Sequence, residues 1–159
     1  MPVLVRSKPP DLAAALTLCV ALLSFGCGAS GPGPATLDTR NDMCAHCRMT
    51  VSDARFAAQL VAPGEEPKFF DDIGCLREYL KTATPVPGSI AYVASYRTHA
   101  WVPARDAFYL RHESIETPMG FHLVAFEDAA GRDAAPAAAG GEKLDAAAVF
   151  GDRLPGSAR

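Results

Sequence analysis

The residues with the most chemical potential in this sequence are the sulfur ligands between residues 42 and 49. This stretch, Asp-Met-Cys-Ala-His-Cys-Arg-Met, holds two thiols, two thioethers and one imidazole, with Cys44 and Cys47 in Cys-x-x-Cys spacing. Such a pair can attach haem, act as a redox dithiol, hold zinc, form a structural disulfide or bind Cu(I). Haem attachment requires His directly after the second cysteine, and the residue there is Arg48, so haem is excluded.

The other four uses stay open, and the surrounding residues favour Cu(I). A thioredoxin-type dithiol lies where an apolar strand enters a helix, whereas the polar residues 39–42 precede this pair. Structural zinc normally needs a second Cys/His pair, and Cys75 stands alone. A strained disulfide between Cys44 and Cys47 is compatible with an oxidising compartment. Thiolate and thioether together select Cu(I), which accepts two or three ligands.

Met49, Met119 and His46 are the candidate ligands besides the two cysteines of the pair. Met119 lies in a Pro-Met-Gly sequence, which predicts a turn that exposes the thioether instead of burying it. His46 lies between the two cysteines and is the expected imidazole if a third ligand is nitrogen. Cys75 falls at the edge of the apolar face of a predicted helix, so we expect it in the core.

Short strands and one amphipathic helix are the elements that must position these residues. Residues 55–62 and 68–70 flank a turn rich in Pro and Gly, which predicts a β-hairpin. Asp71 and Asp72 are expected to cap a helix over residues 73–81, where apolar positions recur with a 3.6-residue period.

The second half of the chain is a looser copy of the same strand, strand, helix, strand order. Residues 90–96 complete the first copy as a strand. In the second copy we expect strands over residues 107–110 and 121–126, an Ala-rich helix over residues 127–139 and a closing strand over residues 147–150. The predicted fold class is therefore α+β, with small antiparallel sheets and helices, and the pattern allows duplicated ββαβ units.

The first 26 residues predict a secretory signal peptide. Arg6 and Lys8 precede an uncharged apolar run over residues 12–25, which is shorter than the roughly 20 residues that a membrane-spanning helix needs. The run leads to Cys27 in a sequence similar to the lipobox of bacterial lipoproteins, in which the cysteine is acylated. An ordinary signal peptide with an incidental Cys27 is the alternative.

The mature chain is expected to be a lipid-anchored periplasmic protein. Residues 27–38, rich in Gly and Pro, predict a flexible tether to a domain over residues 39–159. Gly28 follows the cysteine where an Asp would favour the inner membrane, so we expect the outer membrane. The net charge of −3 excludes a generically basic nucleic-acid binder. The sequence contains no nucleotide-binding or nucleophile motif, so we do not expect an enzyme.

Four motifs in order resemble the NosL family of nitrous oxide reductase accessory lipoproteins. They are Cys44-x-x-Cys47-x-Met49, residues 69–76 (Phe-Phe-Asp-Asp-Ile-Gly-Cys-Leu), Trp101 and Pro118-Met119-Gly120. The resemblance runs from Asp42 to Phe150. It implies a periplasmic Cu(I)-binding lipoprotein with two ββαβ units, here over residues 42–97 and 98–151, and a fold similar to that of organomercurial lyase.

The resemblance also implies a function, a ligand set and partners. The metal ligands would fall on the Cys-x-x-Cys region and on Met119. The protein would deliver copper for the metal cluster of nitrous oxide reductase in denitrification, with the apoenzyme and an ABC-type maturation complex as partners. From the residues alone, a periplasmic thiol–disulfide oxidoreductase and a zinc-stabilised interaction module remain open. The methionines distinguish a thiol–disulfide oxidoreductase from a Cu(I)-binding protein, because redox chemistry needs neither Met49 nor Met119, whereas a soft metal ion uses thioether ligands.

Overall fold

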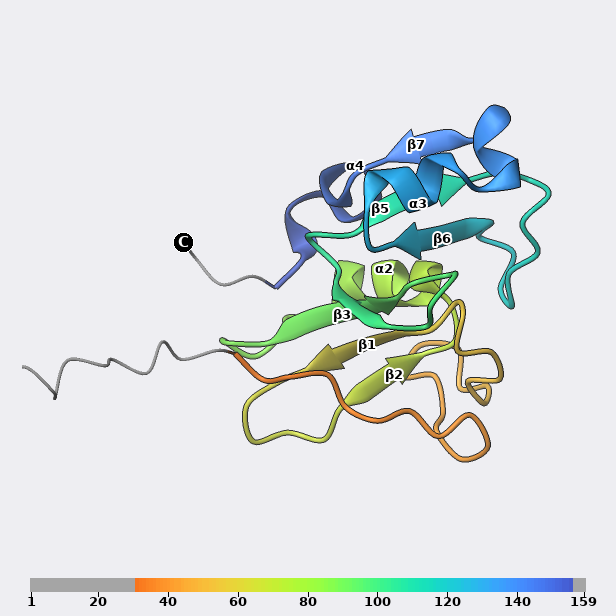
Figure 1. Ribbon diagram of the computed structural model, residues 1–159. Helices are drawn as coiled ribbons and strands as arrows, with labels where there is room; N and C mark the ends of the chain where they lie inside the picture. The colour runs from red at the N-terminus through yellow and green to blue at the C-terminus, as the bar shows by residue number, and fades with distance from the viewer. Residues whose placement is uncertain (1–30, 156–159) are drawn as a thin grey trace, which may run out of the picture. The chain divides into compact units, whose positions relative to one another are not determined.

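The computed structural model describes residues 31–155, which form two antiparallel β-sheets and several short helices (Figure 1). The predicted signal peptide and the predicted lipid-attachment residue Cys27 lie outside the described residues. Within residues 31–155, no helix has both the length and the apolar character needed to cross a bilayer. The expected α+β fold class with small antiparallel sheets is confirmed.

The first sheet has four strands in the order β2-β1-β3-β4, and every neighbouring pair is antiparallel. The strands are β1 (Ala58–Val61), β2 (Lys68–Phe70), β3 (Ile90–Ala94) and β4 (Trp101–Pro103). The predicted hairpin is confirmed, since Ala58 of β1 pairs with Phe70 of β2. Strand β4 carries this sheet past the boundary that we expected between residues 97 and 98.

The second sheet has three strands in the order β6-β5-β7, also antiparallel. Its strands are β5 (Phe108–Arg111), β6 (Leu123–Phe126) and β7 (Glu142–Leu144); the short helices of this half are α3 (Ala129–Asp133), η1 (Pro136–Ala139), α4 (Ala146–Phe150) and η2 (Gly151–Arg153). In both sheets the first strand in sequence is flanked by the second and the third. The order strand, strand, helix, strand therefore occurs twice.

Two expectations for the second half are wrong. The residues expected to form a closing strand are the helix α4, because Asp145 caps it by accepting a hydrogen bond from the Ala148 amide and alanine favours helix. Strand β7 closes the sheet instead. The Ala-rich helix breaks into α3 and η1 before Pro136, which has no amide hydrogen to continue a helical ladder.

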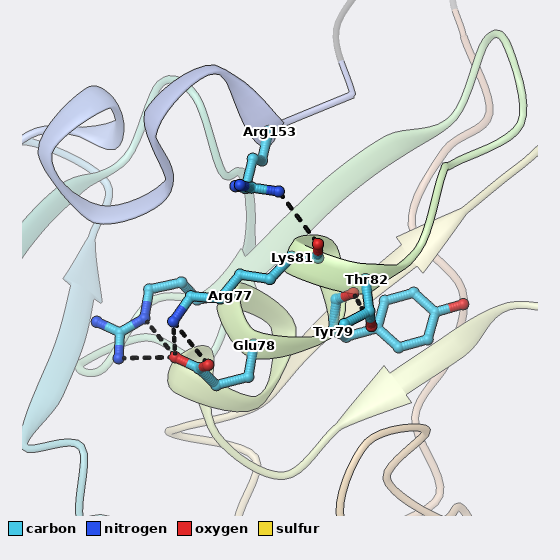
Figure 2. Close-up of polar contacts among 6 residues, drawn as sticks. All are labelled: Arg77, Glu78, Tyr79, Lys81, Thr82 and Arg153. Atoms are coloured by element: carbon cyan, nitrogen blue, oxygen red, sulfur yellow. Dashed lines mark hydrogen bonds and ion pairs between the residues drawn. The ribbon is translucent and has the colours of Figure 1, made fainter.

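Helix α2 (Ile73–Thr82) lies between the two sheets and contacts β1, β2 and β6 (Figure 1). It buries Ile73, Leu76 and Leu80, as the helical period predicts. On its polar side Glu78 pairs with both Arg77 and Lys81, and the Arg153 guanidinium donates to the Lys81 carbonyl at 3.2 Å (Figure 2). The last contact satisfies one of the carbonyls that a helix leaves unpaired at its C-terminus, so both ends of α2 are held.

The part of the expected tether that the structure describes is held against the first sheet. Gln59 is fully buried on the central strand β1 and binds both backbone groups of Ala35, at 2.7 and 3.2 Å. Its cross-strand neighbour Tyr92 donates its hydroxyl to the Pro32 carbonyl at 2.8 Å. A Gly/Pro-rich composition predicts flexibility, but two long polar side chains on one sheet face supply partners for this backbone.

The second half approaches the start of α2 through Phe121. A Cβ atom placed on Gly74 would lie 2.0 Å from the Phe121 ring, so the ring occupies the space that glycine leaves on the first turn of the helix. The close approach requires glycine at this position.

We therefore predict that Gly74→Ala destabilises the protein by about 1–3 kcal/mol through overpacking, although alanine alone would favour helix by up to about 1 kcal/mol. Denaturant unfolding measures this free energy. Gly33→Ala, where a Cβ meets nothing within 4 Å, is the matched control and should be neutral. In a Phe121→Ala background Gly74→Ala should cease to destabilise; an unchanged penalty there would show that the ring is not the cause.

Candidate metal centre

Three cysteine thiols from two distant segments meet in the structure. The sulfur atoms of Cys44, Cys47 and Cys75 all lie within 4.8 Å of one another. Cys44 and Cys75 are buried, Cys47 is partly exposed, and all three are free thiols. From the sequence we expected Cys75 in the core and did not expect it among the ligands. It is buried as expected, but its thiol completes a three-sulfur cluster.

Strand β2 brings the two segments together. Cys44 forms a parallel bridge with Phe69, and the amide of Ala45 donates to the Phe69 carbonyl at 2.8 Å. The chain then continues from β2 through Asp72 into α2, whose third residue is Cys75. Backbone hydrogen bonds along β2 therefore fix Cys44 next to the start of the helix that carries the third thiol.

The Cys-x-x-Cys segment is a tight loop that returns beside its own start. The Arg48 amide donates to the Cys44 carbonyl at 3.0 Å, and the Cys44 amide donates to the Met49 carbonyl at 2.8 Å. Arg48 takes a left-handed backbone conformation with φ 67°, which lets the chain reverse. Met43 and Thr50 form the neighbouring antiparallel bridge. Because opposed residues of an antiparallel pair project to the same face, we expect the Met49 side chain on the face of Cys44 and the Met43 side chain on the other face.

Two buried carboxylates hold this junction. Asp72 caps α2 as the sequence predicts, because its Oδ1 accepts from the Gly74 amide at 2.8 Å. Asp71 is not a second cap, which corrects the prediction: only one residue can occupy the cap position. Its Oδ1 instead accepts from the Ser52 amide at 3.1 Å and ties the segment after the cysteine loop to the same site.

The loop that carries Met119 docks on the first turn of α2. The Met119 amide donates to Asp72 Oδ2 at 3.2 Å. Two residues later the Phe121 ring packs on the helix, and the Arg77 guanidinium carbon lies 5.2 Å from the ring centre. Met119 lies in a turn and is 37% exposed, so it is not a core residue. The second half of the chain thus brings the backbone of Met119 to the N-terminal end of the helix that carries Cys75.

The remaining candidates lie around or away from the cluster. Met49 is 47% exposed, and His46 is exposed within the cysteine loop. His122 was expected on a strand; it precedes β6, and its Nδ1 pairs with the Ile115 carbonyl at 2.8 Å. The ligand roles of Met49, Met119 and His46 stay predictions.

The three cysteine side chains differ in pKa and therefore in protonation state. A hydrogen bond with the Cys75 thiol is the largest influence that lowers the pKa of Cys44 to about 4, and the Cys47 amide, which points at the Cys44 sulfur at 3.4 Å, lowers it further. The same hydrogen bond between Cys44 and Cys75 raises the pKa of the Cys75 thiol. Burial raises the pKa of Cys47 and that of the Asp71 carboxyl. At pH 7 the cluster therefore holds one thiolate and two protonated thiols.

A thiolate with two adjacent thiols can hold a soft metal ion once the thiols lose their protons. A cysteine of lowered pKa is also a property of thiol–disulfide oxidoreductases. In those proteins the Cys-x-x-Cys pair opens a helix, whereas here residues 44–47 form a loop and only Cys75 lies in a helix. The geometry fits a metal centre better than a redox dithiol.

Comparison with known proteins agrees with the ordered motifs. The family model described as NosL matches residues 34–153, which is most of the chain. Comparison with curated proteins gives no match. The matched region contains all three cysteines of the cluster and Met119.

The charge distribution predicts that binding a metal ion to all three sulfurs at pH 7 releases about two protons, since one of the three is already a thiolate. Isothermal titration calorimetry of Cu(I) binding in buffers of different ionisation enthalpy measures this number. Cu(I) binding to the Cys75→Ser variant should release about one proton. As the pH falls through about 4, Cys44 also becomes protonated and binding should weaken further. Equal proton release by the wild type and Cys75→Ser, together with an unchanged Cu(I) affinity of the variant, would show that Cys75 is not a ligand.

Proposed function

The chain belongs to the NosL family, and from this membership and the three-cysteine cluster we propose that it binds Cu(I) and delivers it for assembly of the nitrous oxide reductase metal cluster. The family and the cluster both fit a copper-binding role. NosL is an accessory protein family and not a known enzyme family, which agrees with a protein that carries a metal ion.

The meeting of Cys44, Cys47 and Cys75 is the observation that carries the proposal. Thiolate sulfur is a soft ligand, and soft ligands favour Cu(I) over harder divalent ions. Cu(I) accepts three sulfur ligands, whereas a structural zinc site normally closes with four. Cys44 and Cys75 are buried, but Cys47 is partly exposed, so the cluster is accessible to solvent at Cys47, as a cargo site requires.

Met49 and Met119 support release of the ion. Both thioethers are exposed, Met49 on the face of Cys44 and Met119 beside the start of α2. A thioether is neutral and binds Cu(I) more weakly than a thiolate, so a recipient protein can displace it first. His46, exposed in the same loop, is the candidate nitrogen ligand if one takes part.

The partners and location follow from the same proposal. The recipients would be the apoprotein of nitrous oxide reductase and its ABC-type maturation complex. The protein would work in the periplasm, held by a lipid on Cys27 at the outer membrane.

The proposed Cu(I) site predicts that Cys75→Ser and Met119→Ala each lower Cu(I) affinity at least tenfold, equivalent to about 1.4 kcal/mol. A competition titration against a Cu(I) chelator measures the affinity. Met43→Ala is the control, because Met43 is also exposed but is expected to project to the face opposite Cys44. Met119→Ala should leave the melting temperature of the metal-free protein nearly unchanged, whereas a buried Met→Ala costs roughly 2–5 kcal/mol.

Three results would count against the proposal. Tight Zn(II) binding with weak Cu(I) binding would favour the zinc-stabilised module. Normal copper binding by Met119→Ala would remove the thioether from the site. Copper that stays on the loaded chain in the presence of excess apo-nitrous oxide reductase would refute delivery while leaving binding intact.

A further inference from the structure

Two adjoining cavities form a groove that is separate from the thiol cluster. Each has a volume of about 420 Å³, and the two are adjacent because they share the lining residues Arg55, Tyr96, Phe126, Ala135 and Pro136. Pockets of roughly 300–1,000 Å³ commonly hold small molecules. Among the described residues that line the groove, none is a cysteine or a methionine, so its chemistry differs from that of the metal centre.

The floor of the groove is aromatic. Phe56 and Phe126 are buried there in a hydrophobic cluster distinct from the main core, and Tyr96 packs against that cluster. The Tyr96 ring lies 5.7 Å from that of Phe56 and 6.1 Å from that of Phe126, measured between ring centres. A flat apolar ligand could stack on this half-buried ring and displace water from it.

One lobe of the groove is cationic. Arg55, Arg97 and His99 line it, and none of the described residues lining this lobe is acidic. Arg55 is paired with Asp53 at 2.6 Å and lies 5.8 Å from the Tyr96 ring centre. Within residues 31–155, Arg97 has no hydrogen-bond or ion-pair partner, and its side chain is exposed. The Asp128 carboxylate also lies against Gly131, but its Oδ1 accepts from the Gly131 amide, so the Arg97 guanidinium is left to pair with an anion.

The backbone next to Arg97 is held by a contact between the two halves of the fold. Tyr96 follows β3 and its amide donates to the Ala125 carbonyl of β6 at 2.8 Å, which joins the two sheets at this point. A Cβ on Gly131, in α3, would lie 3.4 Å from Arg97 Nη2, so the guanidinium packs over the glycine. The cationic group therefore lies directly beside the aromatic floor.

We propose that this groove binds a small organic anion with a flat apolar body, of the class of aromatic carboxylates. The ring system stacks on Tyr96 in the apolar lobe, and the carboxylate pairs with Arg97 and approaches His99 in the cationic lobe. The site is independent of copper, because it shares no residue with the thiol cluster.

The test uses 2-naphthoate, which combines two fused rings with a carboxylate, titrated into the full metal-free chain and followed by calorimetry and amide chemical shifts. Saturable binding is expected, with shifts at Gly131 and Ala135. The neutral isostere 2-naphthamide should bind at least tenfold more weakly. Arg97→Gln should weaken naphthoate at least tenfold, while Arg40→Gln, the same change at an exposed arginine that does not line the groove, should leave affinity unchanged.

Three outcomes would overturn the proposal. Absence of saturable naphthoate binding would exclude the ligand class. Equal affinity for the acid and the amide would show that the cationic lobe does not recognise charge. Unchanged affinity in Arg97→Gln, or an equal loss in Arg40→Gln, would show that the anion binds elsewhere or through net charge alone.

Discussion

The buried carboxylate of Asp72 is the interaction on which the metal centre depends. Its two oxygens accept hydrogen bonds from Gly74, at the start of α2, and from Met119, in a loop of the other half of the chain. A buried carboxylate without such donors would cost several kcal/mol, so the fold is strongly constrained to supply both. One group thereby sets where the helix that carries Cys75 begins and where the loop that carries the thioether lies.

The other side of the centre is built by backbone pairing. Cys44 is held by its bridge to Phe69, and its thiol is buried where the strand passes into the helix. The two buried thiols are therefore constrained by packing, while Met49 and Met119 are exposed. In the proposed carrier, buried thiolates would supply affinity, and exposed thioethers would be the ligands that a recipient protein displaces first.

The parts of this structure that follow from local patterns could be predicted from the sequence. The hairpin, the helix from Ile73 and its Asp72 cap depend on neighbours within a few residues. The place of Cys75 in the cluster could not be predicted from the sequence, because a cysteine on an apolar helix face has the same sequence pattern whether it packs in the core or binds a metal. Its meeting with Cys44 depends on the bridge to β2, which no local period reports. The motif over residues 69–76 contained the only signal, since it joins this cysteine to the ordered family pattern. The contacts of Pro32 and Ala35 could not be predicted for the same reason, because their partners are distant in sequence.

Copper K-edge X-ray absorption of the Cu(I)-loaded full chain and of its Cys75→Ser variant tests whether the three cysteine sulfurs form one copper site. We expect a first shell made of sulfur in the wild type, with one sulfur lost in the variant. A shell dominated by nitrogen, or a sulfur count that Cys75→Ser leaves unchanged, would contradict a copper site assembled from the cysteine loop and the first turn of α2.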